Sequence, residues 1–571
     1  MATSATTRRI QATLKNSFGL ARLRPGQREV IDRVLASQHT LAIMPTGAGK
    51  SLCYQLPALL SQGRTLVVSP LIALMKDQVE SLQALGIAAV QLNSALDSAE
   101  ARFAHEAAVD GSARIVMTTP EKLNEPGFLE ALSRHPTSLL VVDEAHCISQ
   151  WGHDFRPAFL DIAAARSALG KPAILALTAT AGDEVARDIC EQLGIPRSGT
   201  INTGIYRPNL ELQVEQVGRE QDKLERAIAY VKATEGSGLV YCATVKAAKA
   251  VHDALHAKGE PAGLYHGKLA AGARHAAQEA FMDGSVRVMV ATNAFGLGID
   301  KADIRFVLHY QLPASLEAYY QEAGRAGRDG QPAQCRLLFL RSDKSVQQFF
   351  MAGRYPSDED AAALYGALQD PPPAGEAWSL ALLQGRLARP RSKLQVALGL
   401  LRRHKVVAMA TDGAVRLLRK GLQANALRSL MATYRGKREQ DRDTLERMVA
   451  YAQAGQCRWR LLVEQMAGEA PFTRCQTCDN CRRIAQQEAA QLASQAQAPS
   501  AEPIVVPATL FAPGELVKVR RYGRGEVQQA SACEVTVAFA DGSRRNFQPD
   551  FVKRYKNNSK QRPVDAGFAP V

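Results

Sequence analysis

The sequence lacks the long apolar runs and the cysteine density of membrane or secreted proteins. No run approaches the ~18 consecutive apolar residues of a bilayer-spanning helix, and residues 1–9 lack the apolar core of a signal peptide. Ten cysteines scattered over 571 residues do not have the dense spacing of a disulfide framework. We therefore expect a cytoplasmic protein with no membrane partner.

Acidic residues are also outnumbered, with 56 Asp and Glu against 70 Lys and Arg, which leaves a formal net charge of +14. Such an excess favours a polyanionic partner, most often a nucleic acid, although a solvated basic surface would give the same count. A chain of 571 residues is too long for one hydrophobic core, so we expect about three to five domains.

Two series of short apolar runs alternate with helical stretches, which is typical of doubly wound parallel sheets. The first series predicts strands at 41–44, 65–69, 114–118, 139–142 and 174–178. The second series predicts strands at 239–242, 263–265, 288–291 and 306–310. The sequence thus predicts an α/β fold with two tandem parallel-sheet lobes, joined near Tyr206-Arg207-Pro208.

A nucleotide site is predicted where Thr46-Gly47-Ala48-Gly49-Lys50-Ser51 follows the first strand. Glycines there let backbone N–H groups close on phosphates, Lys50 would reach the β- and γ-phosphates, and Ser51 would bind Mg²⁺. The general pattern has glycine where Met44 stands, so the motif depends on its context. Asp143 and Glu144 supply that context, as a second Mg²⁺ ligand and a group that orients or deprotonates water.

Two further segments point to the coupling of ATP hydrolysis to a strand. Arg325 and Arg328 would share one face of a helix, as an arginine finger and its neighbour from the second lobe; a surface salt-bridge pair is the alternative. Directly after the two carboxylates come Trp151, Phe155 and Arg156, which suit stacking on unpaired bases.

Beyond lobe 2 the alternation of strands and helices stops. Helices predicted at 378–387 and 392–404 precede a hairpin whose strands, 406–410 and 414–418, flank Asp412-Gly413. This order is that of a winged helix; a helical spacer with a basic face is the alternative. Residues 485–509 are rich in Ala, Gln, Ser and Pro and predict a flexible linker.

The last module, residues 514–555, predicts a small five-strand barrel. Apolar and polar residues alternate in its strands, and glycines separate them. Basic residues are frequent in it: Arg520, Arg521, Arg524, Arg544, Arg545, Lys553 and Arg554.

Taken in order, these motifs resemble the RecQ family of superfamily 2 DNA helicases, from about Phe18 to Cys481. The matching segments are 18–19, 23–27, 44–51, 69–78, 143–159, 178–180, 291–301 and 319–330. The resemblance implies two RecA-like lobes, ATP and Mg²⁺ as cofactors, and 3′→5′ movement on single-stranded DNA with unwinding of duplex DNA.

The resemblance also implies roles for individual residues. Gln27 would read adenine with Arg24 beside it, and an amide does match the N6 donor and N7 acceptor of that base. Gly298, Asp300 and Gln321 would complete the ATP site. Trp151, Phe155 and Arg156 would link strand binding to ATP turnover, with a relay of cleft closure through His146, Thr178 and Thr180.

Four cysteines match the zinc-binding subdomain of that family: Cys457, Cys475, Cys478 and Cys481. Four thiolates with two overlapping CxxC steps suit tetrahedral Zn²⁺. An iron–sulfur cluster or chemically inert cysteines are the physical alternatives.

The predicted domains are lobe 1 (1–205), lobe 2 (206–345), a winged-helix-like module (346–425), the zinc subdomain (426–484), the linker (485–509), a Tudor- or SH3-like barrel (510–557) and a tail (558–571). The module differs from the family in preceding the zinc region, and its hairpin is a candidate strand-separating pin. The barrel resembles that of UvrD-type helicases and could contact DNA or a protein partner.

We expect an ATP-dependent DNA helicase for repair, recombination or replication, acting as a monomer and associated with a bacterial nucleoid. An RNA helicase and a nucleotide-gated DNA-binding protein are the alternatives.

Overall fold

The computed structural model describes residues 4–123, 125, 127–149, 156–296, 301–354, 356–373, 376–410, 413–496, 510–531 and 533–555. The chain divides into two compact units. The first comprises residues 1–449 and 462–471, and the second comprises residues 450–461 and 472–571. Among the described residues, no helix combines the length and the apolar character that a membrane crossing requires.

Lobe 1 is built on a seven-stranded sheet in the order β3-β4-β2-β5-β6-β1-β7, and every pairing in it is parallel. The strands are β1 (Thr40–Ile43), β2 (Arg64–Val68), β3 (Ala89–Leu92), β4 (Ile115–Thr118), β5 (Thr137–Val142), β6 (Ala173–Thr178) and β7 (Thr200–Asn202). The five strands predicted for this lobe are confirmed.

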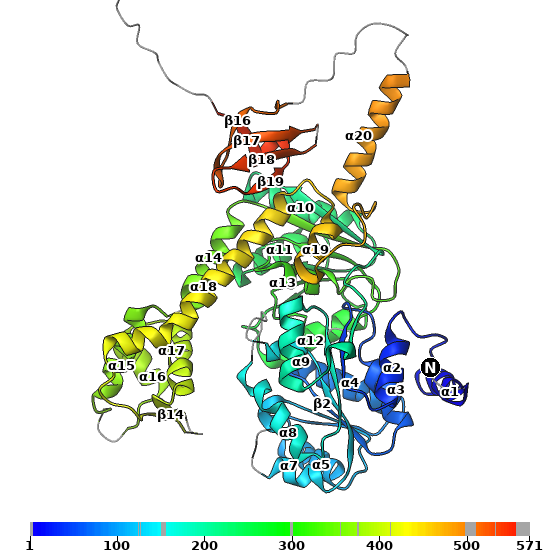
Figure 1. Ribbon diagram of the computed structural model, residues 1–571, viewed down its shortest axis with the longest axis vertical. Coiled ribbons are helices and arrows are strands. Elements are labelled where there is room, and N and C mark those ends of the chain that lie inside the picture. Colours follow the sequence, from blue (N-terminus) through cyan, green and yellow to red (C-terminus); the bar gives the residue numbers. More distant parts are fainter. Residues whose placement is uncertain are drawn as a thin grey trace, which may run out of the picture. The chain divides into compact units, whose positions relative to one another are not determined.

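Helices cover both faces of this sheet, as apolar runs without alternation require. Along β1, Leu41 and Ile43 enter one core, whereas Ala42 enters the other. The helices are α1 (Ser4–Phe18), α2 (Gln27–Leu35), α3 (Leu52–Leu60), α4 (Ile72–Ala84), α5 (Ser98–Val109), α6 (Pro120–Leu123), α7 (Phe128–Ser133), α8 (Ile162–Ala168) and α9 (Asp183–Leu193), with short 3₁₀ turns η1 (Ala145–Ile148), η2 (Pro157–Asp161) and η3 (Arg197–Gly199) (Figure 1).

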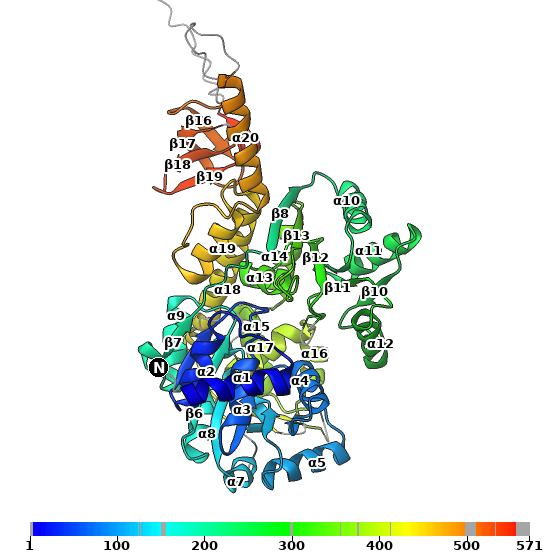
Figure 2. The same ribbon diagram turned by 90° about the vertical axis from the view of Figure 1, so that its right-hand side faces the viewer.

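Lobe 2 has a six-stranded parallel sheet in the order β10-β11-β9-β12-β13-β8, most of whose strands are visible in Figure 2. The strands are β8 (Leu210–Gln216), β9 (Ser237–Tyr241), β10 (Ala262–Tyr265), β11 (Val288–Ala291), β12 (Ile304–His309) and β13 (Ala333–Phe339). The helices are α10 (Glu220–Ala233), α11 (Val245–Ala257), α12 (Ala271–Met282) and α13 (Leu316–Ala323). The four predicted strands are confirmed, and so are the two parallel-sheet lobes.

The strands that the sequence did not reveal lie at or next to a sheet edge: β3, β7, β8 and β13. An edge strand is covered on fewer sides, so it need not be a continuous apolar run. Alternate residues of β8 are polar, and Gln213 and Glu215 bind Arg336 of β13. The polar side chains that stabilise this edge therefore conceal its strands in the sequence.

The segment after lobe 2 contains α14 (Asp343–Arg354), α15 (Asp358–Gln369), α16 (Leu380–Leu387) and α17 (Arg391–Arg403). The antiparallel pair β14 (Val407–Met409) and β15 (Val415–Leu417) follows, and Trp378 forms an isolated bridge to Val415. The predicted helices and hairpin are present and share one hydrophobic core with α15. Asp412, at the expected turn, lies outside the described residues.

Three helices follow: α18 (Ala424–Gln453), α19 (Arg458–Ala467) and α20 (Asp479–Ala496). The prediction of a linker from residue 485 is wrong in its first part, because α20 continues to Ala496. Its alanines and glutamines are good helix formers, and proline enters only afterwards. The rest of the predicted linker, 497–509, and the tail, 558–571, lie outside the described residues.

The C-terminal module is a five-stranded antiparallel sheet in the order β19-β18-β17-β16-β20. The strands are β16 (Leu516–Val519), β17 (Gly523–Ala530), β18 (Val535–Phe539), β19 (Arg544–Phe547) and β20 (Val552–Arg554), with η4 (Pro549–Phe551) before the last. Alternate residues such as Val517 and Val519 form a core of its own. The predicted number of strands is confirmed.

Candidate nucleotide site and metal centre

The loop between β1 and α3 has the backbone shape that its glycines predict. Gly47 and Gly49 have φ angles of +82° and +76°, which favour glycine. A Cβ at Gly49 would lie 2.6 Å from Nε2 of Gln27, and one at Gly47 would lie 3.2 Å from Nη1 of Arg207. Side chains from two other segments thus close around this loop, and its positive φ angles favour glycine at both positions.

Two carboxylates follow β5 and lie beside Lys50. The Asp143 N–H donates to the Val68 carbonyl at 2.9 Å, and the Ser69 hydroxyl lies 3.4 Å from Asp143 Oδ2. Burial raises the pKa of Asp143 to about 6, Glu144 adds to this rise, and Lys50 opposes it. Burial also lowers the pKa of Lys50, against the two carboxylates. This crowding of buried negative charge suits a bound cation.

The Ser51 hydroxyl accepts a hydrogen bond from Nε2 of Gln78 at 3.1 Å, and the Gln78 amide in turn accepts one from Tyr54. Asp143 and Ser51 line the same cavity and offer hard oxygen ligands, which Mg²⁺ prefers. These residues therefore fit Mg²⁺. Gln78 was not singled out from the sequence, because an amide in a helix carries no distinctive signal.

Glu144 begins a series of close polar contacts that runs through His146 to two threonines. It adopts φ +48°, and its Oε2 lies 3.3 Å from Nδ1 of His146. The same His146 nitrogen lies 3.1 Å from Oγ1 of Thr178, which donates to the Thr180 carbonyl at 3.0 Å. Four residues that the sequence suggested separately therefore form one connected, largely buried series.

Lobe 2 supplies the opposite wall of the cavity, which has a volume of about 430 Å³. Predicted site residues from both lobes line it: Arg24, Gln27, Thr46, Gly47, Gly49, Lys50, Ser51, Asp143, Glu144, Gln321, Arg325 and Arg328. Ala48 belongs to the same loop, and its carbonyl accepts a hydrogen bond from Gln27 at 3.0 Å.

The two arginines do not lie on a helix, as their spacing had suggested. Helix α13 ends at Ala323, and Arg325 and Arg328 follow in turns. Gly327 has φ +55°, and a Cβ there would lie 2.5 Å from Nδ2 of Asn209. A Cβ at Gly296 would lie 2.6 Å from Nη2 of Arg325. Gly327 and Gly296 therefore leave room for the turns that bring the two arginines to the cavity.

Arg207 is a site residue that the sequence did not reveal, beyond its place at the lobe junction. Its Nη1 donates to the Thr46 carbonyl at 3.2 Å and to the Gly324 carbonyl at 2.7 Å, and its Nη2 donates to the Gly327 carbonyl. The side chain is only 7% exposed. It thus joins the phosphate loop of lobe 1 to the arginine segment of lobe 2.

Gln27 is held in one orientation in this structure. Its Nε2 donates to the Ala48 and Gly49 carbonyls at 3.0 and 2.9 Å, and its Oε1 accepts from the Arg24 N–H at 2.7 Å. Arg24 also donates to the Gly47 carbonyl. The residue expected to read adenine is therefore connected to the phosphate loop.

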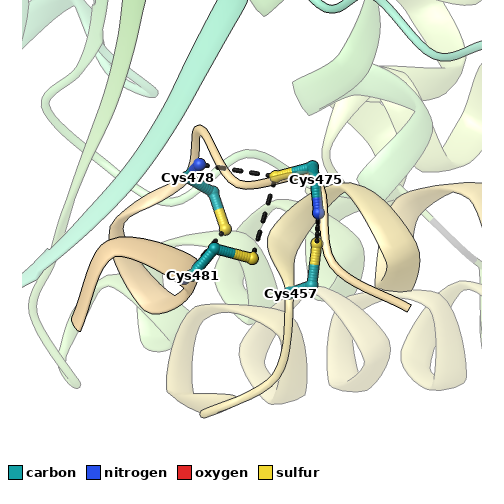
Figure 3. Close-up of side chains that lie close together, drawn as sticks. All are labelled: Cys457, Cys475, Cys478 and Cys481. Atoms are coloured by element: carbon teal, nitrogen blue, oxygen red, sulfur yellow. Dashed lines mark hydrogen bonds between the residues drawn. The ribbon is translucent and has the colours of Figure 1, made fainter. Parts of the chain in front are cut away.

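The four predicted metal-binding cysteines come together in the second unit. Their sulfur atoms all lie within 4.8 Å of one another (Figure 3). Backbone N–H groups donate to three of the sulfurs. The Cys475 N–H lies 3.3 Å from the Cys457 sulfur, the Cys478 N–H lies 3.4 Å from the Cys475 sulfur, and the Cys481 N–H lies 3.5 Å from the Cys478 sulfur. Four converging sulfurs with such donors suit a tetrahedral thiolate site for Zn²⁺.

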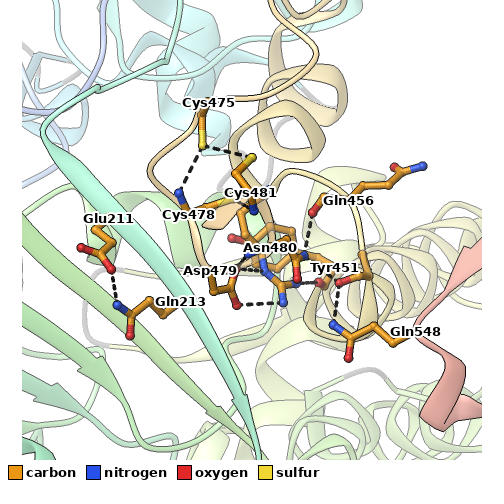
Figure 4. A network of polar contacts seen from close by, with 12 residues as sticks. Glu211, Gln213, Tyr451, Gln456, Cys475, Cys478, Asp479, Asn480, Cys481 and Gln548 are labelled. Carbon is orange, nitrogen blue, oxygen red and sulfur yellow. Dashed lines mark hydrogen bonds and ion pairs between the residues drawn. The ribbon is translucent and has the colours of Figure 1, made fainter. Parts of the chain in front are cut away.

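A network of polar contacts holds residues 451–456, which precede Cys457 (Figure 4). Arg458 is 1% exposed; its Nε and Nη2 donate to the Asp479 carboxylate at 3.0 and 3.1 Å, and its Nη1 donates to the Tyr451 carbonyl at 2.6 Å. Asn480 donates to the Ala454 and Gln456 carbonyls at 2.9 and 2.7 Å. The cysteines are thus oriented by their immediate sequence neighbours.

Three families of known proteins match stretches of this chain. The DEAD/DEAH box helicase family matches residues 24–189, the helicase conserved C-terminal domain matches 221–330, and the RecQ zinc-binding family matches 418–482. The probable ATP-dependent DNA helicase RecS of Bacillus subtilis is 41% identical over 363 residues, which cover 63% of this chain and 73% of that protein. The chain belongs to the RecQ family of helicases.

Two other relatives carry the RecQ name itself. The ATP-dependent DNA helicase RecQ of Bacillus subtilis is 46% identical over 60% of this chain and 58% of its own length. The Haemophilus influenzae protein of the same name is 40% identical over 58% of this chain and 53% of its own. The chain therefore spans little more than half the length of these two relatives. Among solved structures, that of the Mycobacterium smegmatis helicase Lhr bound to ssDNA and AMP-PNP has a TM-score of 0.49 and 20% identity. The match covers 90% of this chain and 68% of that chain. This similarity is too distant to add to the family assignment.

Most of the aromatic loop and part of a second motif of this RecQ-family chain fall outside the described residues. Trp151, Phe155, Gly298 and Asp300 are among them. Arg156 is described, and its Nη1 donates to the Pro70 carbonyl at 3.1 Å, next to the serine that contacts Asp143.

Proposed function

We propose that the chain is an ATP-dependent DNA helicase that translocates 3′→5′ on single-stranded DNA and unwinds duplexes. The observation that carries this proposal is one cavity that holds Lys50, the two adjacent carboxylates and the two arginines of the opposite lobe. Strand separation costs about 1.4 kcal/mol per base-pair step. A motor therefore needs fuel, a grip on the strand and a wedge.

Lobe 1 would supply the phosphate-binding and hydrolytic groups. Lys50 would contact the β- and γ-phosphates, and Glu144 would orient or deprotonate the attacking water. Asp143 and Ser51 would hold Mg²⁺, with Gln78 fixing the direction of the Ser51 hydroxyl. Bound Mg²⁺ supplies neutralisation of phosphate charge.

Lobe 2 would complete the site when the cleft closes. Arg325 and Arg328 would stabilise the charge that develops on the transferred phosphoryl group. Arg207 would act as a positioning residue, because its contacts are with carbonyls of both segments. Closure would then set the distance between the arginines and the phosphates, which couples hydrolysis to lobe movement.

The series from Glu144 through His146 to Thr178 and Thr180 would transmit the state of the cavity to the strand-binding surface. Arg156 lies close to this series in the chain, and Trp151 and Phe155 would stack on bases. We expect Phe155→Ala to lower the stimulation of ATPase activity by single strands; normal stimulation would contradict this role of the loop.

For the wedge, we propose that residues 356–418 form a winged helix. The order α15, Trp378 bridge, α16, α17, β14 and β15 fits that fold. Its hairpin would separate the strands. Deletion of residues 409–415 should abolish unwinding and leave DNA-stimulated ATPase activity intact, whereas unchanged unwinding would reject the hairpin as the pin.

One experiment tests the main proposal. Purified protein is given Mg²⁺ and ATP with forked, 3′-tailed and 5′-tailed DNA duplexes, and with the equivalent RNA strands as activators. We expect unwinding of the forked and 3′-tailed substrates, and stronger stimulation of phosphate release by DNA. Lys50→Ala should release no phosphate but still bind DNA, with the exposed Lys76→Ala as its control. Absence of phosphate release from the unaltered protein would reject the proposal.

A further inference from the structure

The outward face of the C-terminal sheet carries a row of cations across three strands. In the register of the sheet, Lys553 of β20 lies opposite Lys518 of β16, and Lys518 lies opposite Arg524 of β17. All three side chains are exposed. Residues directly opposite each other in antiparallel strands point to the same face, so the three positive charges lie side by side.

Such a row is unfavourable for the sheet itself. Like charges directly opposite one another destabilise an antiparallel pair, and here two consecutive pairs are of this kind. Glu526, an exposed acid on the same strand as Arg524, lies opposite Leu516 instead of a cation. Its partner on the other neighbouring strand is Ala538. In the β20–β16 and β16–β17 pairings, no acid therefore lies directly opposite a cation of the row.

An aromatic ring accompanies the row of cations. The guanidinium of Arg524 lies 4.1 Å from the ring centroid of Tyr555, which follows β20 and whose N–H donates to the Leu516 carbonyl at 2.9 Å. The Tyr555 ring is half-buried. It therefore offers part of its surface beside a cation of the row.

We infer that the outward face of β20, β16 and β17 binds single-stranded nucleic acid, at a site separate from the helicase motor. The row of cations has one charge per strand, about 4.8 Å apart, and would follow the phosphates of an extended polynucleotide. Tyr555, with Arg524 against its ring, gives a base a planar surface on which to stack, which is how single strands are bound without sequence preference. An acidic peptide would match the charges but has no base for the ring.

This site goes beyond the proposed function, because a motor can hydrolyse ATP on a short strand without it. A second point of attachment on the same strand would raise the effective concentration of nucleic acid at the motor. The site should therefore matter for long strands and have little effect on short ones.

The test uses the full chain and fluorescent oligothymidylates of ten and forty nucleotides, with binding measured over a range of salt concentrations. The variant combines Lys518→Ala, Arg524→Ala and Lys553→Ala. Its control removes three exposed cations of the lobes through Arg102→Ala, Lys249→Ala and Lys258→Ala. The slope of log K against log salt is negative, and each phosphate that a side chain no longer neutralises reduces its magnitude by about 0.7 for single strands. We therefore expect the magnitude of the slope for the forty-nucleotide strand to fall by about 2 in the variant and to stay unchanged in the control.

Tyr555→Ala should weaken binding of the forty-nucleotide strand about tenfold, since one ring is no longer present for a base to stack on. The rate of ATP hydrolysis with saturating ten-nucleotide strand should stay unchanged in every variant. Equal slopes in the triple variant and its control would overturn the inference. Competition by polyglutamate as effective as that by oligothymidylate would also overturn it, in favour of an acidic protein partner.

Two further measurements keep the test decisive. Thermal unfolding should show the triple variant at least as stable as the unaltered chain, because it removes like-charge pairs. If the triple variant unfolds, Lys553→Ala alone, at the edge strand, should reduce the magnitude of the slope by about 0.7, and no change would overturn the inference. If the unaltered chain released no phosphate, the proposed motor would be rejected. The salt dependence of strand binding could still be compared between the triple variant and its control.

Discussion

The nucleotide cavity and the cysteine cluster are assembled in opposite ways. The cavity draws on residues from Leu20 to Arg328 and on both lobes, whereas the cluster draws on residues 457–481 alone. The cavity therefore depends on how two sheets approach each other, while the cluster depends on one short stretch and its N–H···S hydrogen bonds. A site of the first kind can open and close; a site of the second kind is suited to holding one fixed geometry.

The largest effect is expected from a substitution in the wall that lobe 2 contributes to the cavity, since it tests whether the cavity needs both lobes. Arg328→Ala should lower the DNA-stimulated kcat for ATP by about 10³-fold or more, because an arginine that stabilises transition-state charge contributes that much. The measurement is steady-state phosphate release at saturating ATP and DNA. Arg219→Ala, an exposed arginine of the same lobe, is the control. A kcat within about tenfold of the unaltered chain would place catalysis in lobe 1 alone.

The next effect concerns the cluster. Cys478→Ala should abolish binding of one equivalent of zinc and lower the stability of the second unit by several kcal/mol, because the binding free energy of a structural Zn²⁺ site is folding free energy. Metal content is measured by elemental analysis, and stability by chemical denaturation. Cys533→Ala, in the same unit but not one of the four clustered cysteines, should keep its zinc. Iron and a visible absorption band in the unaltered protein would mean an iron–sulfur cluster instead.

A smaller effect is expected at Arg207, which contacts both lobes but is not assigned to phosphate. Arg207→Ala should lower kcat about 30- to 100-fold with little change in KM for ATP, since misplacement of a catalytic group by about 1 Å costs on that order. Arg207→Lys should recover only part of the activity, because an ammonium lacks the planar fork that reaches three carbonyls. A change in KM alone would mean that Arg207 contributes to binding and not to closure.

The smallest effect should come from Gln78. Removal of its amide in Gln78→Ala frees the Ser51 hydroxyl to rotate, so the Mg²⁺ concentration for half-maximal ATPase activity should rise about tenfold. The comparison is a Mg²⁺ titration at fixed ATP, with Lys76→Ala on the same helix as the control. An unchanged titration would show that Ser51 is oriented by the loop backbone.

The same contrast explains how much could be predicted from the sequence. The buried strands, the phosphate loop, the two carboxylates and the cysteine spacing are local signals, and the structure brings the described ones together as expected. Arg207 had no such signal, because its partners Thr46, Gly324 and Gly327 are remote in the sequence. Strands β8 and β13 were not predicted, because polar residues alternate with apolar ones at this edge of the sheet and no continuous apolar run marks the strands. The helical continuation of α20 was hidden by a composition that helices and linkers share.

The hydrogen bonds of Gln27 have a consequence for the choice of fuel. To rotate its amide by 180° would set N–H against the Arg24 N–H and C=O against two carbonyls, an exchange of three favourable interactions for three repulsive ones. Guanine presents two acceptors where adenine presents an acceptor and a donor, so with Gln27 as the proposed reader of the base it would need a rearrangement that this side chain resists. We therefore expect GTP to support little phosphate release.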